Sequence, residues 1–435
     1  MDKYTDNYYS QESENTSGNY ESDSVEIELR KTIQRQKKTM FRLMEKINRL
    51  RITCVVLLLI LVVESFLLWG NSGNDTVIPE NTVNNAAGED NTTINIPEEN
   101  QSPEQTDTAA SKVDEAKVES IITSMTLEQK VYQMIFTTPE NLTGVPAVTV
   151  SGDTSKAAIE KYPVGGIIYS QKNIENKQQV TDMLAKLQTF TKTGLFLAIE
   201  ENGNDAVLTN PEVASSGTQA TSFDSTDEAG TAYNAISAEL LNLGFNTNLA
   251  PYTEASSKSS EYLGSDVQTV SNMVKTSVES MSRSNLASTL KYFPISESTS
   301  KTASDMKNSE FLPFKAGIDA GADFVIVSGK ASGEGEPFSM SETYMNKALK
   351  TDLAFGGVVV ADDITSSDIS DTYTQEKAAV KAVNAGADML ICPTGVAKTV
   401  NAILAAVESG EISEKTIDDS VKRIIRVKLF RGIQN

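Results

Sequence analysis

Short apolar runs alternate with amphipathic stretches along the chain beyond residue 112. Eight runs have the length and composition of buried strands: Tyr132–Phe136, Gly165–Tyr169, Leu195–Glu200, Thr247–Ala250, Ala287–Phe293, Phe324–Ser328, Gly357–Ala361 and Met389–Cys392. Between them apolar residues recur every three or four positions, as in Val180, Met183, Leu184 and Leu187, which is the period of a helix. This alternation predicts an α/β fold, a (β/α)8 TIM-type barrel, with an open doubly wound sheet as the alternative.

The seventh run ends on a pair of carboxylates. Val358 to Ala361 follow two glycines and are small or β-branched, as in a strand that is buried on both faces. The chain then becomes polar at Asp362 and Asp363. Because barrel enzymes carry their chemistry where the strands end, this pair is a candidate catalytic site. The structural alternative is that one aspartate caps the next helix, and each residue can hold one of the two roles.

Other strand ends would bring further polar side chains to the same mouth. They are Glu200, Glu201 and Asn202; Lys291 and Tyr292; and Ser328 and Lys330. Separate acidic groups near a lysine suit glycoside hydrolysis, in which retaining enzymes place a carboxylate nucleophile and a proton donor roughly 5–5.5 Å apart. Structural roles are equally open, since Lys291 can be a salt-bridge partner at the rim and Glu200 can cap a helix or pair with that lysine.

The chain before the predicted barrel divides into four segments. Residues 1–29 are polar and predict a disordered tail, and residues 30–51 contain nine Lys or Arg against one acid and predict a basic juxtamembrane helix. Residues 52–70 are apolar and close to the minimum length of a transmembrane helix. Residues 71–111 are rich in Asn, Thr, Glu and Pro and predict a flexible linker.

The position of the basic residues predicts the orientation in the membrane. Because they precede the apolar segment, the N-terminus is expected in the cytoplasm and the barrel domain, residues 112–435, outside it, on a single-pass protein of a bacterial-type cell membrane. A cleaved signal peptide is disfavoured, since the apolar run starts beyond residue 50 and lacks a small-residue cleavage site. The basic residues of the cytoplasmic arm are compatible with a protein partner, and attraction to anionic lipid explains them equally well.

Composition narrows the chemistry further. With 38 Lys and Arg against 59 Asp and Glu, the formal net charge is −21, which disfavours nucleic acid as a partner. The chain contains no histidine, which excludes histidine-based triads, a histidine proton donor and histidine-ligated metals. Catalysis would therefore depend on carboxylates, lysines, tyrosines or hydroxyls. The two cysteines, Cys54 and Cys392, do not suggest a disulfide framework, and nothing indicates a metal or organic cofactor.

Sequence motifs in the predicted barrel match those of a known family in its order. They are Met125–Met134, Gly165–Tyr169, Leu197–Glu200, Asn248–Pro251, Lys291–Pro294, Phe338–Ser341, Phe355–Ile364, Ala385–Met389 and Ser420–Lys428. On these motifs the segment Lys112 to Gly432 resembles the N-terminal catalytic barrel of glycoside hydrolase family 3, specifically its single-domain β-N-acetylhexosaminidase branch. The resemblance implies hydrolysis or recognition of glycans that contain N-acetylglucosamine, such as peptidoglycan fragments, without a cofactor.

The resemblance assigns expected roles to individual residues. Asp362 falls at the family's nucleophile, which attacks the anomeric carbon and forms a glycosyl-enzyme intermediate, and Asp363 is expected to be structural. Lys291 falls at a lysine that hydrogen-bonds sugar hydroxyls, and its neighbour Tyr292 is expected to contact the substrate as well. Glu200 falls at a sugar-binding aspartate and is one methylene longer.

The chain departs from the family where the proton donor should be. The family stretch Lys-His-Phe-Pro-Gly-His-Gly-Asp-Thr reads here Lys291-Tyr-Phe-Pro-Ile-Ser-Glu-Ser-Thr299, so the Asp-His acid/base dyad has no counterpart. Glu297 and Asp305 are the candidate substitutes on the same loop. Loss of a positioned general acid typically costs about 10²–10⁴ in rate. The family's Glu-Gly-Gly has become Asn202-Gly203-Asn204, and an arginine that contacts sugar is replaced by Glu261.

Three functions remain open from the sequence. The first is an exported β-N-acetylhexosaminidase-like hydrolase with a non-standard proton donor. The second is a catalytically inactive relative that binds a glycan or a protein at the same mouth. The third is an anchored scaffold that acts through its cytoplasmic arm. The oligomeric state is not indicated.

Overall fold

The structure of the protein, a computed structural model, describes residues 113–202, 213, 225–256 and 263–433, all within a unit that spans Asn100–Asn435. The predicted tail, juxtamembrane helix, transmembrane segment and linker precede residue 112 and lie outside the described residues, as does Glu261. Among the residues that are described, no helix combines the length and the apolar character needed to cross a membrane.

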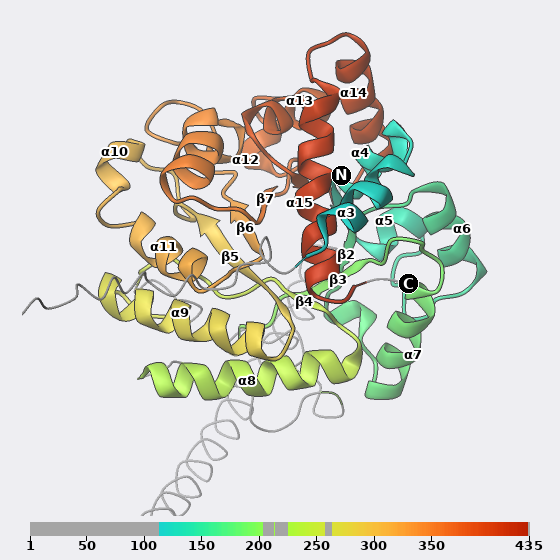
Figure 1. Ribbon diagram of the computed structural model, residues 1–435, viewed down its shortest axis with the longest axis horizontal. Coiled ribbons are helices and arrows are strands. Elements are labelled where there is room, and N and C mark those ends of the chain that lie inside the picture. Colours follow the sequence, from blue (N-terminus) through green and yellow to red (C-terminus); the bar gives the residue numbers. More distant parts are fainter. Residues whose placement is uncertain (1–112, 203–212, 214–224, 257–262, 434–435) are drawn as a thin grey trace, which may run out of the picture. The chain divides into compact units, whose positions relative to one another are not determined.

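Eight parallel strands close into a barrel in sequence order (Figure 1). The strands are β1 (Ile135–Thr137), β2 (Gly166–Ile168), β3 (Phe196–Ile199), β4 (Thr247–Asn248), β5 (Ala287–Phe293), β6 (Phe324–Val327), β7 (Val358–Ala361) and β8 (Met389–Ile391). The pairing of β1 with β8 closes the sheet. The TIM-type barrel is therefore confirmed, and the open doubly wound sheet is wrong.

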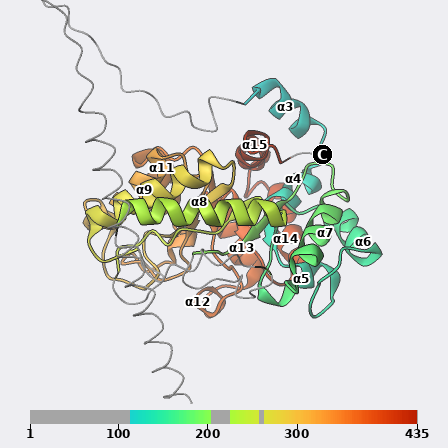
Figure 2. The same cartoon turned by 90° about the horizontal axis from the view of Figure 1, so that it is seen from below.

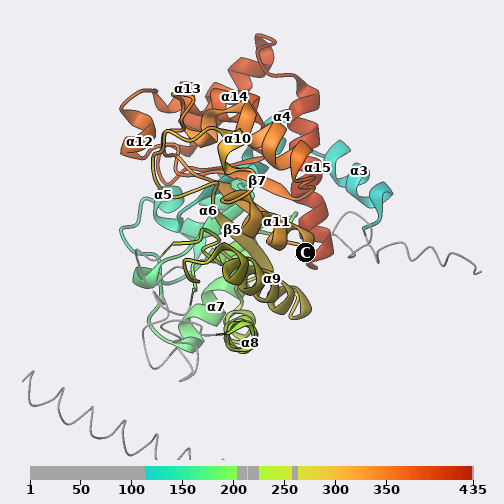
Figure 3. The ribbon, with the colours of Figure 1, turned by 90° about the vertical axis from the view of Figure 1, so that its left-hand side faces the viewer.

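Helices surround the strands and connect them (Figures 1 and 3). The longer ones are α3 (Glu115–Thr123), α4 (Leu127–Gln133), α6 (Asp153–Lys161), α7 (Lys177–Gln188), α8 (Thr226–Leu243), α9 (Val267–Arg283), α11 (Phe311–Asp319), α13 (Gln375–Ala385), α14 (Val396–Glu408) and α15 (Glu414–Phe430). Short helices are α5 (Pro139–Thr143), α10 (Ala303–Met306) and α12 (Ser367–Ser370), with 3-10 turns at Gln171–Asn173 and Phe338–Met340 and a π-helix at Thr343–Asp352. The pattern Val180, Met183, Leu184 and Leu187 forms the buried face of α7, as its period predicts.

Two helices at the start of the domain have distinct environments. Helix α3 packs along α15 (Figure 2), where Arg426 makes two 2.6 Å contacts with Glu115. Helix α4 ends at Gln133, so the first predicted strand began three residues too early. Tyr132 is buried, as an apolar run requires, but it lies on the helix, where a Thr126 capping box starts the turn.

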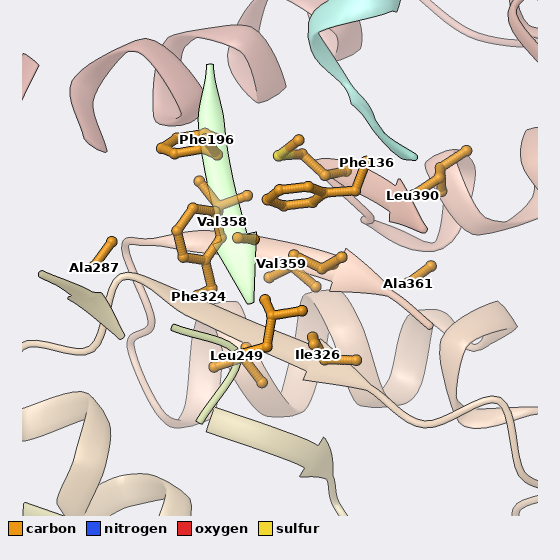
Figure 4. Close-up of a cluster of buried hydrophobic side chains, with 14 of the residues drawn as sticks. Phe136, Phe196, Leu249, Ala287, Phe324, Ile326, Val358, Val359, Ala361 and Leu390 are labelled. Atoms are coloured by element: carbon orange, nitrogen blue, oxygen red, sulfur yellow. The ribbon is translucent and has the colours of Figure 1, made fainter. Parts of the chain in front are cut away.

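The lower part of the barrel is filled by aromatic rings. Phe136, Phe196 and Phe324 come from three different strands and meet with centroids 4.9–5.9 Å apart (Figure 4). Gly166 makes this possible, because a β-carbon there would lie 2.2 Å from the Phe136 ring. The barrel interior is thus a packed core at this level.

Candidate active site

The strand pleat directs three of the predicted site residues into the same mouth. Side chains alternate along a strand, so Phe196 and Glu200 lie on the same face of the chain that forms β3. The register pairs Phe324 of β6 with Val358 of β7, which gives Asp362 the same inward direction as the Phe324 ring. On β5, Thr289 pairs with Phe324, which gives Lys291 the inward direction too. Glu200, Lys291 and Asp362 therefore meet above the aromatic layer.

Asp362 directly follows β7 and is partly buried. The backbone N–H of Asp363 donates to its Oδ1 at 2.8 Å, and the N–H of Gly329 also donates to the carboxylate. Burial raises the pKa of Asp362 to about 6, and Asp363 adds to the rise, while the two N–H groups and Lys291 act against it. The carboxylate is ionised at neutral pH yet poorly solvated, which suits a nucleophile.

Lys291 and Glu200 form an ion pair across the mouth. The Lys291 Nζ atom lies 2.5 Å from Glu200 Oε1, and the lysine side chain is fully buried while Glu200 is one-third exposed. Asn202 donates from its Nδ2 atom to the same Glu200 oxygen at 3.1 Å. Of the two structural roles considered for Glu200, a helix cap and a pair with Lys291, the pair is present here.

Two tyrosines lie beside this ion pair. Lys291 Nζ is 4.1 Å from the centroid of the Tyr252 ring and 5.6 Å from that of Tyr292, and the two rings meet edge to face. Burial raises the pKa of Tyr292, and the charges of Asp362 and Glu200 raise it further, so this phenol stays protonated at neutral pH. Tyr292 can therefore donate a hydrogen bond next to Asp362. The peptide bond between Lys291 and Tyr292 is cis.

Asp363 has a structural role in the turn after β7. Its Oδ1 atom accepts hydrogen bonds from the backbone N–H and the hydroxyl of Thr365, at 2.8 and 2.6 Å. The cap of helix α12 is Ser366 rather than an aspartate. The interpretation of one aspartate as a helix cap is thus wrong, because Asp363 closes the turn that precedes the cap residue Ser366. Asp362 precedes this turn and lies at the mouth.

The two candidate substitutes for the proton donor lie on the loop after β5. Glu297 is exposed, and the adjoining residues of its loop bond to the loop after β6 through Ser298 and Thr299. Asp305 belongs to the capping box of helix α10, where it accepts from the backbone and the hydroxyl of Thr302 at 2.8 Å. These hydrogen bonds lower the pKa of Asp305, which is the direction opposite to that required of a general acid.

Two residues that contact this site were not singled out as functional by the sequence reasoning: Tyr252, beside the Lys291 amine, and Asn248, which bonds the backbone of Glu201. The role of Asp305 could have been predicted, because the pattern Thr302-x-x-Asp305 is typical of a capping box at the start of a helix. Within the described ranges, no group of three or more His, Cys, Asp or Glu side chains is arranged to hold a metal ion. A groove of about 830 Å³ between α13 and α14 contains none of the predicted site residues.

Comparison with known proteins identifies relatives of this barrel. Beta-hexosaminidase A of Pseudoalteromonas piscicida is 25% identical over 328 residues, which cover 62% of this chain and 54% of the relative. A beta-N-acetylglucosaminidase/beta-glucosidase of Cellulomonas fimi is 23% identical, over 48% of this chain and 42% of its own. The chain thus spans about half the length of these two curated relatives.

Solved structures agree with this relationship. A glycoside hydrolase family 3 beta-N-acetylglucosaminidase from Paenibacillus sp. str. FPU-7 is 27% identical and superposes with a TM-score of 0.63, over 72% of this chain and 64% of that one. The model of the glycosyl hydrolase family 3 N terminal domain matches residues 126–427, which is more than half of the chain. The chain therefore belongs to glycoside hydrolase family 3.

Proposed function

We propose that the barrel is a β-N-acetylhexosaminidase-like glycosidase that acts on glycans containing N-acetylglucosamine. The observation that carries this proposal is the position of Asp362, a partly buried carboxylate with a raised pKa that faces Lys291 in the barrel mouth. Its support from relatives is that several family members of known name are hexosaminidases. The natural glycan would be a cell-wall fragment, in keeping with the predicted extracytoplasmic position.

In the proposed reaction Asp362 is the nucleophile. Its carboxylate oxygen forms a bond to the anomeric carbon, the glycosidic bond breaks, and the aglycone leaves with the bonding electron pair. Water then attacks the anomeric carbon, the bond to Asp362 breaks and restores the carboxylate, and the proton of the water passes to solvent or to the departed aglycone. Glu200 and Lys291 would bind hydroxyls of the same sugar, and Tyr292 would donate a hydrogen bond near the reacting carbon.

The proposal extends to location. The apolar segment 52–70 would anchor the protein in a bacterial-type membrane, with the barrel outside, as the basic residues before it favour. A glycosidase tethered in this way would act on wall material within reach of a linker of about 40 residues.

A second candidate function is recognition of a glycan without efficient turnover. The observation that favours it is the proton donor: the chain has no histidine, and Asp305 is engaged in a helix cap with a lowered pKa. A site of this kind would retain the sugar contacts of Glu200 and Lys291 while losing about 10²–10⁴ in rate toward glycosides with poor leaving groups.

The experiment that separates these functions uses 4-nitrophenyl β-N-acetylglucosaminide and the purified full chain. A nitrophenolate leaving group needs little protonation, so a working Asp362 releases it even without a general acid. We expect release by the natural protein and by Asp363→Asn, and its loss in Asp362→Asn. Equal release by both variants would rule out Asp362 as the nucleophile.

A binding measurement completes the assignment. If the folded protein releases no nitrophenol but binds N-acetylglucosamine in calorimetry, and Glu200→Gln weakens that binding, the recognition function holds. If it neither hydrolyses the probe nor binds the sugar, both proposals fail.

A further inference from the structure

Two asparagines at the ends of strand β4 hold the neighbouring strand β3 by their side chains. Asn248 is fully buried; its Oδ1 accepts from the backbone N–H of Glu201, and its Nδ2 donates to the Glu201 carbonyl, both at 2.9 Å. Asn246, which directly precedes β4, bonds two residues of the β3 segment: it accepts from the Leu197 N–H at 2.8 Å and donates to the Leu195 carbonyl at 2.9 Å. Each amide replaces the two hydrogen bonds that another strand residue would supply.

The Asn248 contact lies where the regular ladder stops. The last backbone bond between the two strands runs from Leu249 N–H to the Ile199 carbonyl at 2.8 Å. Beyond that point the chain of β3 continues through Glu200 to Glu201, and the Asn248 side chain bonds the N–H and the carbonyl of Glu201. Glu200 is therefore held on both sides, by the backbone of β4 before it and by an asparagine after it.

This restraint bears directly on the ion pair at the mouth. The Glu200 carboxylate forms an ion pair with Lys291 at 2.5 Å and accepts a hydrogen bond from Asn202 at 3.1 Å. Both contacts need the turn at 200–202 to keep its path. The Glu200 side chain is long and one-third exposed. The range of positions open to its carboxylate therefore depends on how firmly the backbone at Glu200 is held.

We propose that Asn248 is a positioning residue for sugar binding: by clamping both backbone groups of Glu201 it holds the Glu200 carboxylate against Lys291. This inference rests on the proposed function, in which Glu200 and Lys291 bind sugar hydroxyls. Asn248 itself faces away from the mouth toward Met281 of helix α9, at 3.8 Å from its sulfur, and acts only through Glu200.

The test compares Asn248→Asp with Asn246→Asp. Each substitution keeps the size of the side chain and replaces one hydrogen bond by a repulsive contact between two oxygens. Asn246 precedes β4 and Asn248 ends it, so the two variants perturb opposite ends of the same strand. With 4-nitrophenyl β-N-acetylglucosaminide we expect Asn248→Asp to lower kcat/KM by about 5- to 100-fold, mainly through KM. Asn246→Asp should change kcat/KM less than twofold at a similar loss in Tm.

Two further readouts distinguish positioning from general damage. The pH midpoint of kcat/KM should remain near that of the natural protein, since Asp362 follows β7 and its carboxylate is held by the backbone N–H groups of Asp363 and Gly329. In a double-mutant cycle, Asn248→Asp should add little to Glu200→Gln, because both act on the same carboxylate. A shifted midpoint, additive losses, or equal losses in the two asparagine variants would overturn the proposal.

A readout without sugar keeps this test independent of the proposed function. In the protein alone, loosening Glu200 should expose the buried Lys291 amine to acetic anhydride, measured by mass spectrometry of the peptide that contains it. We expect severalfold faster acetylation in Asn248→Asp and no change in Asn246→Asp. If the natural protein neither hydrolyses nor binds the sugar, the proposed function fails but the role of Asn248 can still be tested. Equal acetylation of Lys291 in both asparagine variants would then reject the positioning role of Asn248.

Discussion

A single carboxylate, Asp362, joins the stability of the domain to its proposed chemistry. Its pKa of about 6 in the folded protein exceeds the ordinary value of an aspartate, so the folded state holds its proton more tightly than the unfolded chain does. Stability from this group is present at low pH and is lost as the pH rises toward 6. Above that pH the ionised, poorly solvated carboxylate destabilises the fold.

Asp362→Asn should therefore stabilise the protein at neutral pH while abolishing hydrolysis. The neutral amide removes the cost of a buried charge, by about 1–3 kcal/mol in the free energy of unfolding at pH 7.5, with little difference at pH 4. Urea unfolding at both pH values measures this. A variant that is less stable than the natural protein at pH 7.5 would contradict it. Asp363→Asn serves as the control, since it removes the neighbouring charge while its amide oxygen can still accept from Thr365.

Nitrophenol release should depend on the same ionisation. Since only the ionised Asp362 attacks, kcat/KM should rise with pH through a midpoint near 6 and then level off. Rates measured between pH 4.5 and 8 on the full chain test this. A midpoint near 4 would mean that Asp362 is better solvated than its surroundings indicate.

Lys428 on helix α15 has the opposite effect to Asp362, because its contribution to stability increases as the pH rises. It is fully buried, its Nζ atom donates to Gln133 and to the Gly194 carbonyl at 2.7 and 2.8 Å, and burial lowers its pKa to about 7. Between pH 7 and 10 the unfolded chain then holds more protons than the folded one, so stability from this group rises with pH.

Lys428→Met should remove that rise. The contribution from this residue is up to about 1.4 kcal/mol per pH unit, so the free energies of unfolding of the natural protein and the variant should diverge between pH 7 and 9. Lys130→Met, which removes a lysine paired with Asp418, is the control for the loss of a lysine side chain. Parallel curves for Lys428→Met and the natural protein would contradict the assignment.

At the scale of elements, the packing of the barrel interior depends on one residue without a side chain. Gly166 on β2 lets the Phe136 ring enter the space that a β-carbon would fill, 2.2 Å from the ring and 2.9 Å from Phe196. The three rings come from β1, β3 and β6 and pack against one another, so an obstruction beside one ring displaces the others.

Gly166→Ala should lower the free energy of unfolding by about 1–3 kcal/mol through overpacking. Gly356→Ala is the matched control, since that glycine precedes β7, is exposed and has no heavy atom within 4 Å of the added carbon. Thermal unfolding of the two variants measures the effect. Restoration of Tm by Phe136→Leu in the Gly166→Ala background would locate the strain at that ring, and an unchanged Tm for Gly166→Ala would contradict it.

At the scale of the whole molecule, the barrel is one part of a chain whose first 112 residues lie outside the described structure. Their sequence predicts a membrane anchor, and we expect the full chain in the membrane fraction after cell lysis. Deletion of residues 1–70 should move it to the soluble fraction, whereas deletion of residues 1–29 should not. Recovery of the variant that lacks residues 1–29 in the soluble fraction would reject residues 52–70 as the anchor.

The order of elements and the position of the nucleophile candidate were determined by the sequence itself. Apolar runs such as Val358 to Ala361 are local patterns, and a carboxylate that ends one of them must lie at the mouth of a parallel barrel. The register decided what no local pattern carries: that Glu200 meets Lys291, which is 91 positions later, and that Asn248 holds Glu201 across 47 residues. Side chains so distant in sequence become neighbours only when the sheet closes, because hydrogen bonds between strands set which residues lie side by side.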